Sequence, residues 1–170
     1  ARPAIATWTP EEMNKLTNYI KTTYSRSIKE ECDPEEKRAM ENRRGLFWLL
    51  KNTGMRTSEA LNLRWKDIYE EEVETPKGKV VVLIFKVKET KALRRTKPNR
   101  WVIGTPSLGK ILLRIRQSNK PFTEENDFIF TTSDGKRTGK TFFRKIFEAS
   151  GTYQDNESGT YRTAGHLRSY

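Results

Sequence analysis

The chain has 170 residues, a length sufficient for one folded domain. Its composition, with 34% hydrophobic and 32% charged residues, excludes a disordered chain. A single cysteine, Cys32, excludes an internal disulfide, and no cysteine and histidine cluster offers a metal site. Lysine and arginine number 33 against 22 aspartate and glutamate, and the net charge of +11 favours either an anionic partner such as nucleic acid or a basic surface kept for solubility.

Three helices are expected in the first third of the chain. The stretch WTPEE predicts a helix start with a capping box at Thr9. A longer helix is predicted from about Asp33, and Gly54 suits its C-terminal end. A short helix over SEALNLRW is expected to follow, capped by Ser58 or Thr57.

A hairpin and two further helices are predicted in the rest of the chain. After the acidic stretch YEEEVET, the β-branched run KGKVVVLIFKVKET predicts a strand, RRTKPN a turn and RWVIG the returning strand. TPSLGKILLRIRQ predicts a helix capped by Thr105, DFIFTTSDGK an extended piece with an Asp-Gly turn, and KTFFRKIFEAS a helix ended by Gly151. This order predicts an α+β fold, mainly helical with a small antiparallel sheet, in a single domain over residues 1–170. No apolar run could cross a membrane or serve as a secretion signal, so we expect a soluble, cytoplasmic protein.

Basic residues concentrate on the predicted hairpin. Between positions 86 and 100 there are seven of them against the single acid Glu89: Lys86, Lys88, Lys91, Arg94, Arg95, Lys97 and Arg100. A basic hairpin can contact the phosphates of a nucleic acid, and such contacts dominate salt-dependent affinity. The alternative is an edge strand whose charges prevent aggregation. We expect double-stranded DNA as the partner.

Arg56 lies in the glycine-bearing turn TGMRTSEALNLRW, between two predicted helices. Such a junction holds a side chain rigidly, and the planar guanidinium matches two oxygens of a phosphate. Glu59, three residues later, is expected to fix its orientation. The alternative is a structural salt bridge between Arg56 and Glu59.

The last residues, TAGHLRSY, contain the only histidine, His166, and Arg168 two positions later. A lone histidine is more often structural than catalytic. No Ser/His/Asp arrangement can be assembled, and neither GMRTSEAL nor TSDGKRTGKT has the spacing of a phosphate-binding loop.

TGMRTSEALNLRWKDI resembles the first signature box of the tyrosine recombinase (phage integrase) family, with the pattern T-G-x-R-x-x-E-x-x-x-L-x-W-x-D-I and Arg56 as the first active-site arginine. WTPEEM resembles the beginning of the catalytic domain of that family, DFIFTTSDGKRTGKTFFRKIFEASG a later stretch, and HLRSY the second box. The resemblance extends from about Thr9 to Tyr170 and implies the DNA breaking-rejoining fold.

The resemblance implies phosphoryl transfer on DNA without a metal or other cofactor. A tyrosine would attack the scissile phosphate, so that a 3′-phosphotyrosyl intermediate forms and a 5′-hydroxyl leaves. Arg56 and Arg168 would hold the non-bridging oxygens. A hairpin lysine would protonate the leaving oxygen; Lys91 fits the family best, and Lys97 and Lys88 remain open.

The resemblance also implies a truncated catalytic domain, without the core-binding domain of the family and without the segment that carries the nucleophile. Tyr170 is too close to Arg168 to be that nucleophile, so the fragment is expected to be an inactive monomer. His166 is displaced by one position from the family's histidine and either replaces it as a phosphate ligand or only flanks the site. The full-length protein is expected to be the integrase of a mobile element, a tetramer on DNA and associated with the nucleoid of a bacterial host. The alternative is a non-catalytic, DNA-binding or regulatory relative that keeps the fold and the basic groove.

Overall fold

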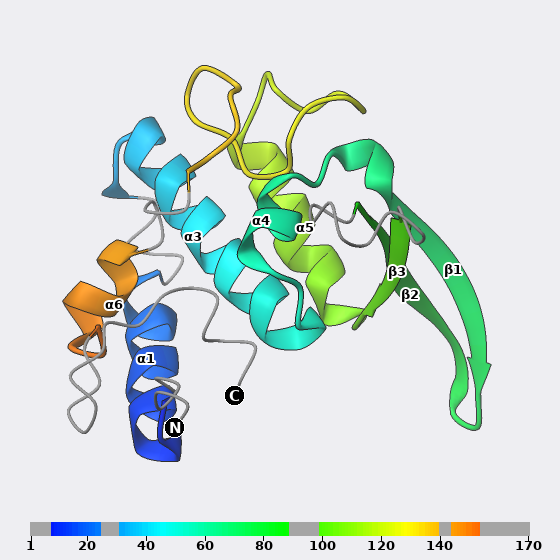
Figure 1. The fold of residues 1–170 in the computed structure, drawn as a ribbon, viewed down its shortest axis with the longest axis horizontal. Helices are drawn as coiled ribbons and strands as arrows, with labels where there is room; N and C mark the ends of the chain where they lie inside the picture. The colour runs from blue at the N-terminus through cyan, green and yellow to red at the C-terminus, as the bar shows by residue number, and fades with distance from the viewer. Residues whose placement is uncertain (1–7, 25–30, 89–98, 140–143, 154–170) are drawn as a thin grey trace, which may run out of the picture.

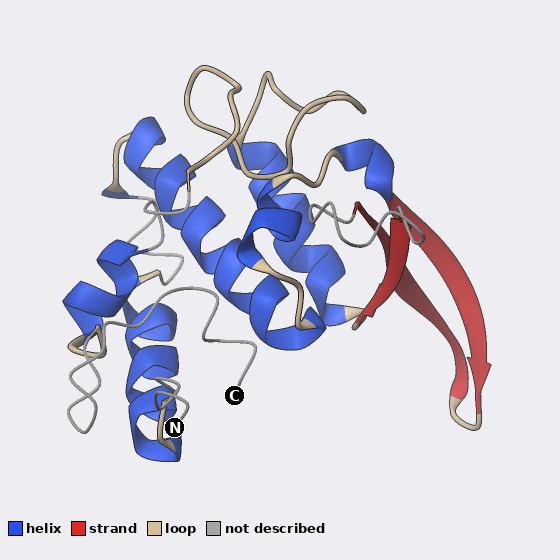
Figure 2. Ribbon diagram, viewed as in Figure 1, coloured by secondary structure: helices blue, strands red, loops and turns tan. Residues whose placement is uncertain are grey.

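A group of helices lies beside a three-stranded antiparallel sheet in the computed structural model, which describes residues 8–24, 31–88, 99–139 and 144–153 (Figures 1 and 2). The helices are α1 (Pro10–Thr23), α3 (Pro34–Thr53), α4 (Thr57–Leu61), α5 (Ser107–Ser118) and α6 (Arg144–Ser150), with a short 3-10 helix, η1 (Trp65–Asp67). The strands are β1 (Ile68–Thr75), β2 (Gly78–Lys88) and β3 (Asn99–Gly104). The α+β fold is confirmed.

Both long helices begin at the predicted residues, and α3 also ends at the predicted one. At the start of α1 the hydroxyl of Thr9 accepts a hydrogen bond from the main-chain N–H of Glu12 at 3.2 Å, and the Glu12 carboxylate accepts from the N–H of Thr9 at 3.5 Å. Asp33 caps α3, because its Oδ1 accepts from the N–H of Glu36 at 2.9 Å. Gly54 ends α3 with a φ of 68°, a conformation that favours glycine.

The starts of α4 and α5 were predicted at the wrong residue. The N-cap of α4 is Arg56, not Thr57 or Ser58, and the helix ends at Leu61 because a separate turn begins shortly afterwards. In that turn the Asp67 carboxylate accepts from the main-chain N–H of Arg64 at 3.0 Å, which starts η1. For α5, Pro106 occupies the N-cap position instead of Thr105.

The predicted hairpin is confirmed as β2 and β3, but the sheet has a third strand that the sequence did not predict. The strand order is β1-β2-β3, and Phe85 of β2 lies opposite both Ile68 and Val102. β1 carries the acidic run, and most of its residues are exposed. A strand with little buried surface lacks the alternation of apolar and polar residues that identifies strands in a sequence.

The hydrophobic core joins the helices to the inner face of the sheet. Its largest fully buried side chains include those of Phe47 in α3, Phe85 in β2 and Phe130 in the loop after α5. A buried amide pair ties two of these parts together. Asn42 of α3 donates to Oδ1 of Asn119, at the end of α5, at 2.8 Å. Asn119 in turn donates to the main-chain oxygen of Ile129 at 2.8 Å. The two buried amide groups thus find hydrogen-bond partners inside the protein.

In the part of the chain that the structure describes, no helix has the length and apolar character needed to cross a membrane.

Candidate functional site

Arg56 is held at a rigid junction between α3 and α4. Gly54 turns the chain, the side chain of Met55 is fully buried, and Arg56 takes an extended conformation with φ −71° and ψ 147° before α4 begins. The buried methionine anchors one side of Arg56 and the helix fixes the other. The base of the Arg56 side chain therefore has little freedom to move.

Glu59 holds this junction through the main chain. Its side chain is 1% exposed, and its Oε1 accepts from the main-chain N–H of Arg56 at 2.9 Å and from Nη2 of Arg100 at 3.0 Å. Glu59 was expected to orient the Arg56 side chain; in the structure it fixes the Arg56 main chain instead. The ion pair of Glu59 is formed with Arg100 of β3, not with the guanidinium of Arg56, so the alternative of an Arg56–Glu59 salt bridge is wrong.

The guanidinium of Arg56 retains unused donor capacity. Its Nη1 is buried and has no hydrogen-bond partner among the described residues. Three neighbouring polar atoms are also buried and have no hydrogen-bond partner among the described residues: Nε of Arg100, Oε2 of Glu59 and Oγ1 of Thr57. Arg100 is bonded to Glu59 through its Nη2, and Thr57 follows Arg56 in the sequence. A buried polar group without a partner costs about 1–3 kcal/mol. Since Arg100 is already paired with Glu59, Nη1 of Arg56 is the donor of this set that is suited to an anion.

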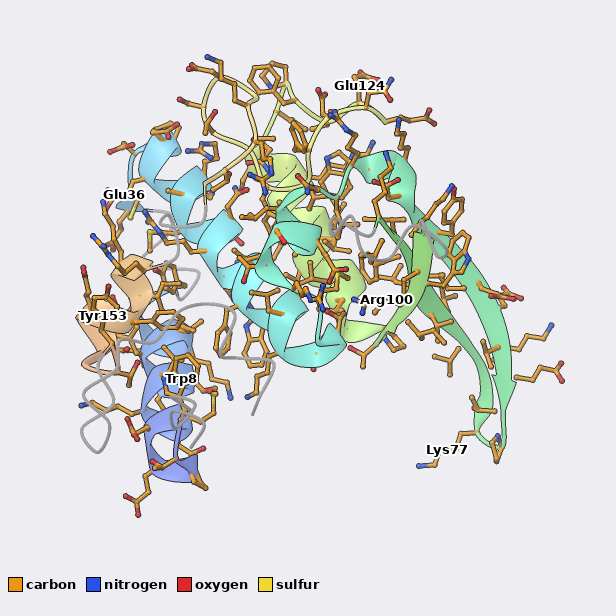
Figure 3. All side chains as sticks on the ribbon, in the orientation of Figure 1. Trp8, Glu36, Lys77, Arg100, Glu124 and Tyr153 are labelled. Atoms are coloured by element: carbon orange, nitrogen blue, oxygen red, sulfur yellow. The ribbon has the colours of Figure 1, made fainter. Side chains whose placement is uncertain are left out.

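The strand register divides the basic cluster between the two faces of the sheet. Arg100 lies opposite the buried Val87, so its side chain is on the inner face, where Figure 3 labels it beside α4. Lys86 lies opposite the exposed Trp101 and Lys88 opposite Asn99, on the outer face. Arg100 is thus committed to Glu59, while Lys86 and Lys88 remain available to a partner. The alternation of RWVIG, which places Arg100 on the same face as Val102, is the signal that indicates this in the sequence.

Six of the predicted site residues lie outside the described residues: Lys91, Arg94, Arg95, Lys97, His166 and Arg168. Their approach to Arg56 stays a prediction. The contribution of Arg100 to the Arg56 junction is the feature that sequence reasoning missed, because it predicted only a DNA contact for that residue.

Comparison with family models matches residues 7–170 to the Phage integrase family. The chain belongs to this family. The match covers almost the whole chain and includes the junction at Arg56 and the sheet. The resemblance to tyrosine recombinases that TGMRTSEALNLRWKDI predicts is thereby confirmed.

Solved structures of this family share the fold. XerH site-specific recombinase bound to its difH substrate before cleavage is 18% identical, with a TM-score of 0.67, over 99% of this chain and 42% of that one. XerH in a post-cleavage complex with palindromic difH is 19% identical, with a TM-score of 0.65, over 96% of this chain and 40% of that one. XerA recombinase is 19% identical, with a TM-score of 0.53, over 98% and 49%. This chain therefore spans between two fifths and one half of those proteins. Comparison with curated protein sequences gives no match.

Proposed function

We propose that the full-length protein is a tyrosine-type site-specific recombinase, which cleaves and rejoins double-stranded DNA through a 3′-phosphotyrosyl intermediate. The observation that carries this proposal is the Arg56 guanidinium, which is partly buried, projects from a fixed junction and has a donor, Nη1, with no partner among the described residues. Membership of the Phage integrase family and the fold shared with XerH, a site-specific recombinase described bound to its difH substrate, support the same conclusion.

Arg56 stabilises the negative charge that develops on the phosphate. A tyrosine hydroxyl attacks the phosphorus atom, gives up its proton to solvent and forms a P–O bond, while the bond to the 5′-oxygen breaks. Two non-bridging oxygens gain charge in the transition state, and a preorganised guanidinium stabilises that state without having to reorganise. Glu59 supports this step indirectly, since it fixes the main chain from which Arg56 projects.

The leaving 5′-oxygen must gain a proton when its bond breaks. A lysine of the β2–β3 hairpin is the proposed donor, with Lys91 preferred and Lys88 and Lys97 as the other candidates. Arg168 is the proposed second phosphate ligand, and His166 either assists it or flanks the site. Rejoining reverses these steps, with a DNA 5′-hydroxyl as the nucleophile and the tyrosine as the leaving group. DNA from a mobile element is the proposed substrate.

The decisive experiment measures covalent adducts between the full-length protein and a nicked DNA substrate. Arg56→Ala is expected to lower adduct formation by about 100-fold or more, the effect of removing one charge-stabilising donor from an active site. Arg56→Lys should restore little, because a lysine cannot offer two donors in one plane. Arg144→Ala serves as the control, since Arg144 lies on α6 in an exposed pair with Glu148.

A folding assay separates catalysis from structure. Since Nη1 of Arg56 has no partner among the described residues, Arg56→Ala should leave the melting temperature nearly unchanged. An adduct that forms at the parental rate in Arg56→Ala would contradict the proposal. DNA binding without any adduct in the parent protein would instead support the non-catalytic relative.

A further inference from the structure

A second basic site lies between α3 and α5, and no residue of α4 lines it. It is a cavity of about 430 Å³ whose lining includes Arg44, Trp48, Asn52, Ser107, Lys110 and Arg114. The three α3 residues are four positions apart, so they follow one face of that helix. The volume is within the range of pockets that bind small molecules, about 300–1,000 Å³.

The positive charge of the cavity exceeds what the nearby acid can neutralise. Arg44, Lys110 and Arg114 line it, and none of the described residues that line it is acidic. Glu41, which is 3% exposed, lies 3.3 Å from Nη2 of Arg114 and 3.9 Å from Nη1 of Arg44. Arg44, Arg114 and Lys110 carry three positive charges against the one carboxylate of Glu41, and an anion would balance the excess of two.

Arg44 has a buried donor that lacks a hydrogen-bond partner among the described residues. Its Nη1 is buried and makes no hydrogen bond to a described residue, and the Glu41 oxygen at 3.9 Å is too distant to form one. Burial lowers the pKa of Arg44, and the charge of Arg114 lowers it further, while Glu41 acts in the opposite direction. Two guanidiniums that repel each other are stabilised by a shared anion, and the planar fork of arginine fits a phosphate group.

The N-terminal end of α5 adds to the positive charge of the cavity. Ser107 is its first residue, no acid occupies its first turn, and Lys110 follows closely. The N-terminal end of a helix carries partial positive charge, so a lysine there is unfavourable unless an anion is nearby. Together with the arginines, this arrangement favours a phosphate over a neutral ligand.

Trp48 and Asn52 supply contacts of a different kind. The indole of Trp48 lines the cavity and is only partly buried, with Phe47 in an edge contact at 5.1 Å and Nζ of Lys51 5.4 Å from its ring centroid, so a flat group would have to use the ring surface that these two contacts leave. Stacking of a nucleobase on an aromatic ring contributes about 1–3 kcal/mol. Asn52 uses its Nδ2 to donate to the main-chain oxygen of Trp48 at 2.8 Å, so its Oδ1 can accept from an amino group of a base.

We propose that the cavity between α3 and α5 binds a nucleotide, with its phosphate on Arg44, Lys110 and Arg114 and its base against Trp48. This site is separate from the proposed chemistry at Arg56 and does not depend on it. The phosphate can belong to a free nucleotide or to the end of a DNA strand. The two sources share the chemistry that the cavity recognises.

The test is calorimetric titration of the chain with 2′-deoxyadenosine 5′-monophosphate, deoxyadenosine and inorganic phosphate. The nucleotide is expected to bind best, phosphate more weakly, and deoxyadenosine not measurably. Arg44→Gln and Lys110→Gln should each weaken nucleotide binding at least tenfold. Lys110 is exposed, so its variant retains the fold even if the Arg44 variant does not. Arg144→Gln, on α6, is the matched control and should bind as the parent does.

Competition then identifies the source of the phosphate. Displacement of the nucleotide by a 5′-phosphorylated oligonucleotide, but not by the same oligonucleotide without its 5′-phosphate, assigns the site to a DNA end, and absence of displacement by either assigns it to a free nucleotide. Equal binding of deoxyadenosine and the nucleotide, or unchanged binding in Lys110→Gln, would overturn the proposal. Arg56→Ala should leave nucleotide binding unchanged, so this experiment tests the cavity independently of the proposed recombinase function.

Discussion

At the scale of single residues, the junction at Arg56 depends on a carboxylate that serves two partners. Glu59 accepts from the main chain of Arg56 three residues before it and from the side chain of Arg100, which is 41 positions later in the sequence. A buried carboxylate is tolerated only where it is paired and hydrogen-bonded. Arg100 supplies the counter-charge and one of the hydrogen bonds of the buried Glu59 carboxylate.

The Glu59–Arg100 pair predicts a coupled effect on stability. Arg100→Gln leaves a buried carboxylate without its counter-charge, and we expect the free energy of unfolding to fall by about 1–3 kcal/mol, less than for a fully buried pair because Arg100 is 35% exposed. In the double variant with Glu59→Gln the loss should be smaller than the sum of the single losses. Urea denaturation of the four proteins measures this. Additive losses would show that the pair is not coupled, and Arg144→Gln is the exposed-pair control.

Ionisation of Tyr24 is expected to lower the stability of the protein at alkaline pH. The residue is buried at the end of α1, and burial, assisted by the nearby Tyr19, raises its pKa to about 12 from the usual 10.0. Above pH 10 the unfolded chain therefore loses this proton while the folded chain keeps it. Because the unfolded state then binds fewer protons, stability falls as the pH rises from about 10 to 12.

One pKa unit corresponds to about 1.4 kcal/mol, so the shift is worth about 2.8 kcal/mol in total. About 2 kcal/mol of this is expected to be lost between pH 10 and pH 12. Tyr24→Phe should remove that part of the pH dependence and leave the remainder. The measurement is urea denaturation at several alkaline pH values, with tyrosinate absorbance as a direct record of the ionisation. An unchanged slope in Tyr24→Phe would contradict the assignment.

At the scale of elements, α3 and α5 approach each other at a glycine. A Cβ atom at Gly45 would lie 2.1 Å from Cδ1 and 2.9 Å from Cγ1 of Ile115, which is itself fully buried. Real side-chain atoms do not approach so closely, so the contact requires a residue without a side chain. The same two helices line the basic cavity and are connected by the Asn42–Asn119 amide pair.

Gly45→Ala should therefore destabilise the protein despite the better helix propensity of alanine. We expect a net loss of about 1–2 kcal/mol, because overpacking a core costs about 1–3 kcal/mol and the propensity gain offsets at most about 1. Gly109→Ala, in α5, is the matched control: no atom lies within 4 Å of its added Cβ, and it should be neutral or slightly stabilising. Thermal denaturation compares the two, and a stabilised Gly45→Ala would show that the helices separate freely.

At the scale of the whole molecule, charge of the two signs is separated along the sheet. The edge strand β1 is acidic, while Lys86 and Lys88 lie at the far end of β2, next to the basic turn in the sequence. The β1–β2 turn, which carries Lys77, projects from the body of the protein (Figures 1 and 3). β2 has 11 residues, so its two ends are separated by about 35 Å, given about 3.3 Å for each residue of a strand. A DNA duplex is expected at the Lys88 end.

This polarity predicts a salt dependence that differs between the two ends of β2. Lys88→Gln should reduce the slope of log affinity against log salt concentration by about one, the effect of losing one phosphate contact. Lys77→Gln removes the same charge from the other end and should leave the slope unchanged. Fluorescence anisotropy with a labelled duplex at several salt concentrations measures both. Equal effects of the two variants would indicate attraction by net charge alone.

The sequence by itself determined the local features of this protein. The capping box at Thr9 places the start of α1, and Asp33 and Gly54 place the two ends of α3, because those signals act between residues three or four positions apart. The alternation and β-branched residues of β2 and β3 predict the hairpin, and the long box around Arg56 predicts the family.

Tertiary structure decided the features that depend on distant partners. Pairing with β2 makes a strand of the acidic segment β1, whose residues bury too little surface to show a pattern of their own. Sheet register turns Arg100 inward to Glu59 and not outward to a partner, and the packing of α3 on α5 creates the basic cavity. Charge in a sequence indicates that an anion can be bound, but the arrangement of the elements determines which cations are free to bind it.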